Sequence, residues 1–257
     1  MAQATRRQQS SQPRAAARVS PGELRELRRM AGVTPPPGRQ VPPIFRVDVS
    51  YLPPLKLDAR GDVAQMIEGA NQIFADSPAA ALSMCGVLCC FSHPYRSFAV
   101  SETLKFLQTV QWSPQFQELA RAAAAQERAA YRAATSAGES YSLERLLKLE
   151  LREQEIRVIG YFYGRRNGIS QAGQEAARIA RQLQQAGSVR AQATAHIIAA
   201  GGYQLGAIYP GPVPTVTWDQ TAWDELHRGV ALFGEVHQNK NLEKVIGKVT
   251  GPAGTTT

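Results

Sequence analysis

The chain has 257 residues, of which 29 are Lys or Arg and 21 are Asp or Glu, giving a formal net charge of +8. This length is enough to bury a substantial hydrophobic core. No segment reaches the ~18 consecutive apolar residues that a membrane span needs, and the first residues lack the apolar stretch of a secretory signal peptide. We therefore expect neither a membrane-spanning nor a secreted protein.

The positive charge is concentrated near the N-terminus. Residues 1–49 contain nine Arg, no Lys and three acidic residues, a net charge of +6, which leaves only +2 for the rest. Arg binds phosphate in a bidentate manner and stacks on bases, which Lys does not, so this pattern favours nucleic acid as the partner. The alternatives are a solvated tail and, because the segment is poor in acidic residues, a mitochondrial transit peptide. The candidate nucleic-acid-binding residues of this arm are Arg6, Arg7, Arg14 and Arg18.

The basic, Pro-rich arm, residues 1–43, is predicted to contain one short helix. Residues 1–19 are polar and lack periodic apolar positions, which is typical of disorder. A capping-box signal at residues 20–23 starts the helix, and the five prolines of residues 34–43 predict an extended linker after it. The apolar face of the helix predicts docking on either a neighbouring subunit or the core of the same chain; we favour the subunit, through the oligomerisation candidates Leu24, Leu27 and Met30.

Residues 44–249 are predicted to form a helical core, followed by a flexible tail at 250–257. Residues 44–52 alternate apolar and polar positions, and we expect an extended strap across the helices. Helices with start and stop signals are predicted at 63–75, 78–91, 101–112, 114–137, 142–167, 171–186, 188–200 and after Asp219, with an irregular connection at 203–218 and a last amphipathic turn at 242–249. The predicted fold class is all-α, a single core of about eight helices with an extended basic N-terminal arm and a flexible C-terminal tail.

The helix predicted at 78–91 is apolar on all sides, so we expect it at the centre of the core. It carries the three cysteines of the chain, Cys85, Cys89 and Cys90. Their odd number and clustering argue against a disulfide framework and fit a reducing compartment. A metal or redox pair at Cys85 and Cys89 would need further ligands at zinc-finger spacing, which the sequence lacks. We therefore predict buried, apolar cysteines and no metal site.

The helix predicted at 142–167 is the longest with a clear helical period, and we expect the core to be organised around it. Ser142 is its expected N-cap, and Gly168 is expected just beyond its C-terminus. Its apolar stripe consists of Leu143, Leu146, Leu147, Leu151, Val158, Ile159 and Phe162. Two ion pairs on the opposite surface are predicted from i,i+4 spacing: Glu144–Lys148 and Glu153–Arg157.

Three arginines of the helix predicted at 114–137 lie seven and four residues apart and therefore share one face. We predict that they line a groove with further arginines of the next two helices, and that this groove follows a phosphate backbone while two tyrosines stack on bases. The predicted groove residues are Arg121, Arg128, Arg132, Arg157, Arg165, Arg166, Arg178 and Arg181, with Tyr161 and Tyr163 for stacking. The alternative is that these arginines form salt bridges with Glu118, Glu127, Glu153, Glu155 and Glu175.

No catalytic motif is present: the chain lacks a phosphate-binding P-loop, a nucleophile elbow and a zinc-protease HExxH motif. His196 is expected in the core or at an interface, whereas His227 and His237 are expected at the surface. Three glutamates that cannot share one helical face are expected to form a solvated side rather than an acid/base pair: Glu150, Glu153 and Glu155. We therefore predict no enzyme, no cofactor and no small-molecule substrate.

The Arg-rich arm, the tethered amphipathic helix, the proline linker and the compact helical core together resemble viral nucleocapsid and coat proteins. Runs such as RAAAAQERAAYRAATSA, at residues 121–137, are similar to the proline-alanine-serine-rich proteins that coat the double-stranded RNA of polymycoviruses. The characteristic C-terminal core pattern of flexible filamentous plant-virus coat proteins is not matched. The resemblance implies a protein that encapsidates viral RNA, assembles into a homo-oligomer or filament by arm exchange, and resides in the virion or host cytoplasm.

The competing class is a helical matrix-type or accessory protein that binds an acidic partner or a membrane surface. An arm that binds membranes usually interleaves Lys and large apolar residues with its other basic positions. Residues 1–19 contain no Lys and no such interleaving, which favours RNA over a membrane. The sequence leaves open whether the RNA is single- or double-stranded.

Overall fold

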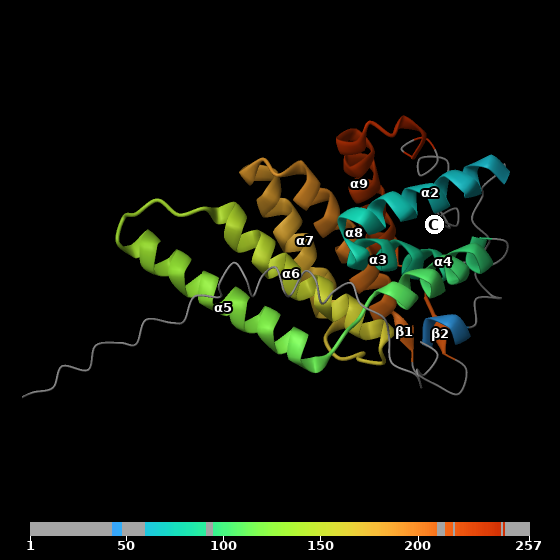
Figure 1. Cartoon of the computed structure of the whole chain (residues 1–257), viewed down its shortest axis with the longest axis horizontal. Coiled ribbons are helices and arrows are strands. Elements are labelled where there is room, and N and C mark those ends of the chain that lie inside the picture. Colours follow the sequence, from blue (N-terminus) through green and yellow to red (C-terminus); the bar gives the residue numbers. More distant parts are fainter. Residues whose placement is uncertain are drawn as a thin grey trace, which may run out of the picture.

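The computed structural model of the chain describes residues 43–47, 60–90, 95–209, 214–217, 219–242 and 244. Within these ranges, eight α-helices, one 3-10 helix and one short hairpin form a helical body (Figure 1). The elements are η1 (Pro43–Arg46), α2 (Arg60–Asp76), α3 (Pro78–Leu88), α4 (Tyr95–Thr109), α5 (Pro114–Ser136), α6 (Leu143–Phe162), α7 (Ile169–Ala186), α8 (Val189–Gly206), β1 (Ile208–Tyr209), β2 (Thr215–Val216) and α9 (Gln220–His237). The predicted all-α class is confirmed. None of the described helices has both the length and the apolar character needed to cross a bilayer.

Several predictions concern residues outside the described ranges. They include the arm helix, the proline linker and the tail, and with them the candidates Arg6, Arg7, Arg14, Arg18, Leu24, Leu27 and Met30. The division of the chain into arm, core and tail, and the roles of these seven residues, therefore stay predictions.

Helix α3 is the buried centre of the body and contacts α2, α4, α6, α8 and α9. Every residue from Ala79 to Leu88 is buried. The Oγ of Ser77 accepts a hydrogen bond from the N–H of Ala80 at 3.2 Å, and Pro78 occupies the first helical position, which is a favoured way to start a helix. The predicted central helix and its start are both confirmed.

The three cysteines lie at the C-terminal end of α3, where they are buried and free. Burial raises the pKa of Cys85 and Cys90, and it raises the pKa of Cys89 to about 12. These thiols therefore stay protonated and behave as small apolar side chains, as predicted. In the part of the chain that the structure describes, no group of three or more His, Cys, Asp or Glu residues could hold a metal ion.

Helix α8 approaches its neighbours at a distance that only glycine allows. Gly201 and Gly202 were predicted to end this helix, but it continues to Gly206, so that prediction was wrong. A Cβ on Gly202 would lie 2.4 Å from the Cα of Gly173 in α7, and a Cβ on Gly201 would lie 2.5 Å from the side chain of Ser83 in α3. Each glycine costs about 1 kcal/mol of helix propensity, and together they let α8 pack closely against both neighbours.

Helix α6 begins as predicted, with the Ser142 side chain as its N-cap, and its predicted apolar stripe is buried or half-buried. It ends at Phe162, earlier than the stop predicted at Gly168. Gly164 adopts a left-handed conformation with φ +88°, and the N–H of Arg165 donates a hydrogen bond back into the last turn. This is the Schellman arrangement that terminates many helices. Gly168 instead precedes α7.

Helix α9 follows the sequence pattern closely. Asp219 accepts a hydrogen bond from the N–H of Ala222 at 3.0 Å, which confirms the predicted N-cap. The predicted apolar face is buried and consists of Trp223, Leu226, Val230 and Phe233. This face packs α9 against α8.

Two short segments differ from the sequence prediction. Pro43–Arg46 forms a 3-10 helix in which Ile44 is buried, so the predicted strand is wrong at its start, while the strap residues after Val47 lie outside the described ranges. In the connection predicted to be irregular, Ile208–Tyr209 pairs antiparallel with Thr215–Val216. Neither segment changes the helical architecture.

Helix α5 lies along the outer side of α6 (Figure 1). The main hydrophobic cluster includes residues of α2, α3, α4, α6, α7, α8 and α9, but none of α5, which the structure describes in full. The residues that α5 buries are Ala120, Ala123, Ala124, Glu127 and Ala134. Because burying one methyl group contributes only about 0.8 kcal/mol, the apolar contacts of α5 are weaker than those of the core helices, and ion pairs to α6 add to them.

We expect Gly202→Ala to lower the free energy of unfolding by about 2 kcal/mol, since overpacking costs up to about 3 kcal/mol and better helix propensity returns about 1 kcal/mol. The new Cβ would meet backbone atoms of Gly173, which cannot rotate away. Gly69→Ala is the matched control, because its Cβ would meet only side-chain atoms of Leu242, the nearest being Cδ1 at 2.4 Å, and a side chain can rotate away where backbone cannot. Denaturant unfolding measures both, and equal losses would contradict a special role for the α7–α8 spacing.

Candidate nucleic-acid interface

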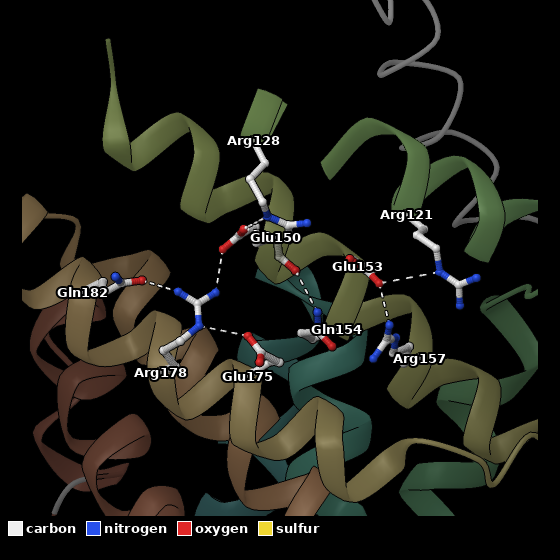
Figure 2. A network of polar contacts seen from close by, with 9 residues as sticks. All are labelled: Arg121, Arg128, Glu150, Glu153, Gln154, Arg157, Glu175, Arg178 and Gln182. Carbon is white, nitrogen blue, oxygen red and sulfur yellow. Dashed lines mark hydrogen bonds and ion pairs between the residues drawn. The ribbon is translucent and has the colours of Figure 1, made fainter. Parts of the chain in front are cut away.

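Glu150 lies at the centre of a network of charged side chains between α5, α6 and α7 (Figure 2). One of its carboxylate oxygens accepts a hydrogen bond from Arg128 Nε at 2.8 Å, and the other accepts one from Arg178 Nη2 at 2.6 Å. Burying a carboxylate is costly unless the charge is paired and hydrogen-bonded. Here two guanidinium groups, from the two helices that flank α6, supply both partners.

Arg178 continues the network across the surface of α7. Its Nε donates to Glu175 at 2.9 Å, and its Nη1 donates to Gln182. Burial acts to lower the pKa of Arg178, but the hydrogen bonds to Glu150 and Glu175 outweigh burial and raise this pKa above its ordinary value. All three guanidinium nitrogens therefore have partners, and the side chain is held in one orientation.

A second acidic centre lies about one turn further along α6. Glu153 accepts a hydrogen bond from Arg157 Nη2 at 2.6 Å, and Arg121 Nε lies 4.0 Å from the same oxygen. Arg121 also donates to Glu118, its neighbour on α5, at 3.1 Å. The predicted Glu153–Arg157 pair is thus confirmed, although its carboxylate is buried rather than on the outer surface.

The network carries no net charge. The structure brings together four of the predicted groove arginines, Arg121, Arg128, Arg157 and Arg178. Four carboxylates match them: Glu118, Glu150, Glu153 and Glu175. For these four arginines, the alternative of salt bridging is therefore the arrangement that the structure shows.

Glu150, Glu153 and Glu155 do not form a solvated side of α6, so that prediction was wrong. They are 5 %, 6 % and 8 % exposed. Glu155 accepts a hydrogen bond from the Ser77 hydroxyl at 2.5 Å and one from Arg152 at 2.9 Å. The three glutamates point in different directions, but neighbouring helices cover α6 on several sides, so each carboxylate meets a different partner.

A further buried carboxylate, that of Glu127, joins α5 to the start of α6. Glu127 pairs with Arg145 at 2.8 Å and accepts a hydrogen bond from the Tyr141 hydroxyl. Nearby, the predicted Glu144–Lys148 pair forms at 2.5 Å, and its hydrogen bond lowers the pKa of Glu144. Ion pairs thus tie the middle of α5, from Arg121 to Arg128, to α6.

Four predicted arginines are exposed and form no ion pair with any residue in the described ranges: Arg132, Arg165, Arg166 and Arg181. Arg132 lies near the C-terminal end of α5, whereas Arg165 and Arg166 follow the C-terminal end of α6. Because α5 and α6 run antiparallel (Figure 1), these positions lie at opposite ends of the helix pair. The eight arginines predicted to line a groove therefore fall into two sets, four paired with carboxylates and four exposed at separate places, and their role in binding stays a prediction.

Tyr161 is not available for stacking on a base, which corrects another prediction. It is 2 % exposed, and its ring packs edge-on against Phe162 with centroids 5.5 Å apart. Its hydroxyl has no hydrogen-bond partner among the described residues, and burial raises the pKa of the phenol. The helical period placed Tyr161 next to the stripe, but the packing of α6 against α3 puts it inside the core.

At the C-terminal end of α6, three of the predicted residues lie beside an aromatic residue that the sequence analysis missed, Trp112. The half-buried Tyr163 donates its hydroxyl hydrogen bond to the carbonyl of Val110, and its ring lies tilted against Trp112 with centroids 6.0 Å apart. The guanidinium of Arg165 lies 5.6 Å from the centre of the Trp112 ring, within the range of a cation–π contact. Trp112, Tyr163, Arg165 and the adjacent Arg166 form what we call the turn cluster.

Two histidines join helices rather than forming a catalytic pair. His196 is buried, as predicted, with its Nδ1 2.5 Å from Glu225, which also accepts a hydrogen bond from Arg228 at 3.2 Å. His237 was predicted at the surface, but it is half-buried and its Nε2 lies 2.7 Å from Asp76. The first contact links α8 to α9, and the second links α9 to α2.

Neither a protein-family model, nor a curated protein, nor a solved structure matches this chain. Its function is therefore argued from its own residues. They offer two populations of arginine: one is paired with carboxylates, and the other is exposed, with Arg165 over the ring of Trp112.

We expect Arg178→Ala to lower the free energy of unfolding by about 1–2 kcal/mol. This is less than the roughly 3–5 kcal/mol that breaking a fully buried pair costs, because Arg128 stays on Glu150 and the Arg178 side chain is 38 % exposed. Arg181→Ala on the same helix is the control and should change stability by no more than about 0.5 kcal/mol. Urea unfolding measures both variants, and equal effects would contradict the role of Arg178 in the network.

We expect Tyr161→Phe to leave the free energy of unfolding unchanged or to raise it by about 1 kcal/mol, because a buried hydroxyl without a partner is destabilising. Tyr163→Phe is the control, since it removes a hydroxyl that donates to a carbonyl and should lose about 1 kcal/mol. Thermal and denaturant unfolding compare the two. A clear loss of stability in Tyr161→Phe would mean that its hydroxyl has a partner after all.

Proposed function

We propose that this protein is a non-enzymatic structural protein that binds and coats RNA and assembles with copies of itself. The distribution of arginine carries the proposal. Residues 1–49 hold +6 of the net charge of +8 in nine arginines, and four further arginines stay exposed after the buried carboxylates of the core are paired. An excess of arginine favours phosphate as the ligand, because arginine binds phosphate through two parallel hydrogen bonds.

The turn cluster supports a contact with the RNA strand as well as with its charge. Arg165 already lies over the ring of Trp112, and the ring of Tyr163 is adjacent. Single-stranded RNA is bound by such combinations, in which bases stack on aromatic or guanidinium planes and neighbouring cations meet phosphates. No base-reading module accompanies the cluster in the sequence, so we expect binding without strong sequence preference.

Assembly is proposed to involve the arm. Leu24, Leu27 and Met30 form the apolar face of the predicted arm helix, and a proline-rich linker of residues 34–43 joins it to the core. Such a tether allows a helix to reach a neighbouring subunit. Together with the resemblance to viral nucleocapsid and coat proteins, this supports a location on viral RNA, in the virion or the host cytoplasm.

We expect the full chain to bind a labelled oligouridine with an affinity that falls steeply as salt rises, because arginine–phosphate contacts release counterions. Replacing both Arg165 and Arg166 by Glu should reduce the slope of log K against log salt by about 1.4, since each contact on a single strand contributes about 0.7. Fluorescence anisotropy measures the slope. A further reduction is expected when Ser replaces the arm residues Arg6, Arg7, Arg14 and Arg18.

The matched control replaces Lys240 and Lys244 by Glu. Both side chains are exposed near the end of α9, so the change in charge is the same and the slope should stay that of the unmodified chain. Equal reductions in the two double variants would contradict the turn cluster as a contact. Salt-independent affinity would contradict RNA binding itself, and binding to anionic vesicles but not to RNA would favour the matrix-type alternative.

A further inference from the structure

We propose that Glu150 and Glu153 act as internal competitors of RNA phosphate. Their carboxylates pair with arginines of α5, α6 and α7, and these arginines bind RNA only after phosphate has displaced the carboxylates. This inference rests on the proposed RNA-binding function and describes how the core site is regulated. We call the two glutamates the acidic gate, and the paired arginines are Arg121, Arg128, Arg157 and Arg178.

The geometry of the acidic gate resembles that of an arginine–phosphate contact. A carboxylate and a phosphate both offer arginine two acceptor oxygens at short distance, and the nitrogen–oxygen distances here are 2.6 Å from Arg178 and 2.8 Å from Arg128 to Glu150. Glu150 is buried, whereas the side chains of Arg128 and Arg178 are 41 % and 38 % exposed. A phosphate that arrives from solvent therefore meets the guanidinium groups before it meets the carboxylate.

Exchange of one anion for the other requires no change in the hydrophobic core. Arg121 and Arg128 belong to α5, which contributes no residue to the main cluster and buries mainly alanine. Arg178 keeps its hydrogen bond to Glu175 at 2.9 Å, so it stays oriented on α7 while its Nη2 changes partner. The core helices α3 and α8 are thus unaffected when the acidic gate opens.

The closed gate explains why the core adds little to long-range attraction. Four arginines and four glutamates cancel, so the first contacts with RNA fall to the arm and to the exposed arginines. Once these hold a strand, its phosphates lie close to the network at high local concentration. The phosphates then compete with Glu150 and Glu153 for these arginines. Because a buried carboxylate left without its partners is costly, the exchange is incomplete in the unmodified chain, and each arginine that does change partner binds one more phosphate. The four paired arginines are therefore available only to an RNA strand that the arm and the exposed arginines already hold.

The test measures the salt dependence of oligouridine binding in the full chain with the gate residues neutralised one at a time. Glu150→Gln keeps the size and an acceptor oxygen of the side chain but removes its charge, which frees Arg128 and Arg178. Its slope of log K against log salt should steepen by up to about 1.4, or about 0.7 for each arginine that turns to a phosphate. Glu153→Gln should act in the same direction.

The loss of any negative charge raises the affinity for a polyanion, so the control must lose one charge outside the network. Glu139→Gln is this matched control. Glu139 is exposed in the turn after α5 and forms no ion pair with a described residue. This variant should bind slightly more tightly with an unchanged slope. A steeper slope in a gate variant, beside an unchanged slope in Glu139→Gln, supports the proposal.

Two results overturn the inference, and only the second of them also contradicts the proposed RNA-binding function. If both gate variants keep wild-type helicity by circular dichroism and bind with the wild-type slope, the gate is refuted while the proposed function stands. If neither the unmodified chain nor any variant binds oligouridine at low salt, the proposed function fails and the gate fails with it. Should Glu150→Gln not fold, Glu153→Gln alone decides the outcome.

Discussion

The buried carboxylates of α6 determine how the outer helices are arranged. A charged group taken out of water loses several kcal/mol of hydration, which is recovered only when good partners surround it. Glu150 meets this requirement through Arg128 and Arg178, one from each flanking helix. Because both guanidinium groups must reach the same carboxylate (Figure 2), the positions of α5 and α7 on α6 are coupled. Glu127 imposes a similar requirement near the start of α6, through Arg145.

The protein therefore has two kinds of helix packing, which differ in their response to salt. Around α3 and α8, apolar side chains and the close approach of Gly202 to Gly173 hold the helices together, and these contacts are not screened by salt. Between α5 and α6, alanines and ion pairs hold the helices together. Ion pairs at partly exposed positions are screened by salt, and other anions compete with their carboxylates for the arginines. Salt and added anions are therefore expected to weaken the contacts between α5 and α6 more than the packing of the core.

Local signals in the sequence determined the helices and the centre of the core. The N-caps at Ser77, Ser142 and Asp219 each bond to an N–H three residues away, so both partners stand in one short segment and are recognisable without a structure. The apolar residues of 78–91 identified the central helix, because a helix that is apolar on all sides has to be buried. The same local reasoning predicted the cysteines correctly. Arginine excess and its position in the arm were likewise visible in the sequence.

Only the tertiary structure decided which charged and aromatic residues are available to a partner. Glu150 is 22 residues from Arg128 and 28 from Arg178, and Tyr163 is 53 residues from the carbonyl that it bonds, so no spacing rule connects them. The helical period shows which side of a helix is apolar, but it does not show what covers the other sides. For this reason the sequence left open whether these arginines line a groove or pair with carboxylates, and the fold pairs four of them. The sequence also read Gly202 as a helix end, whereas the neighbouring helix requires a glycine there.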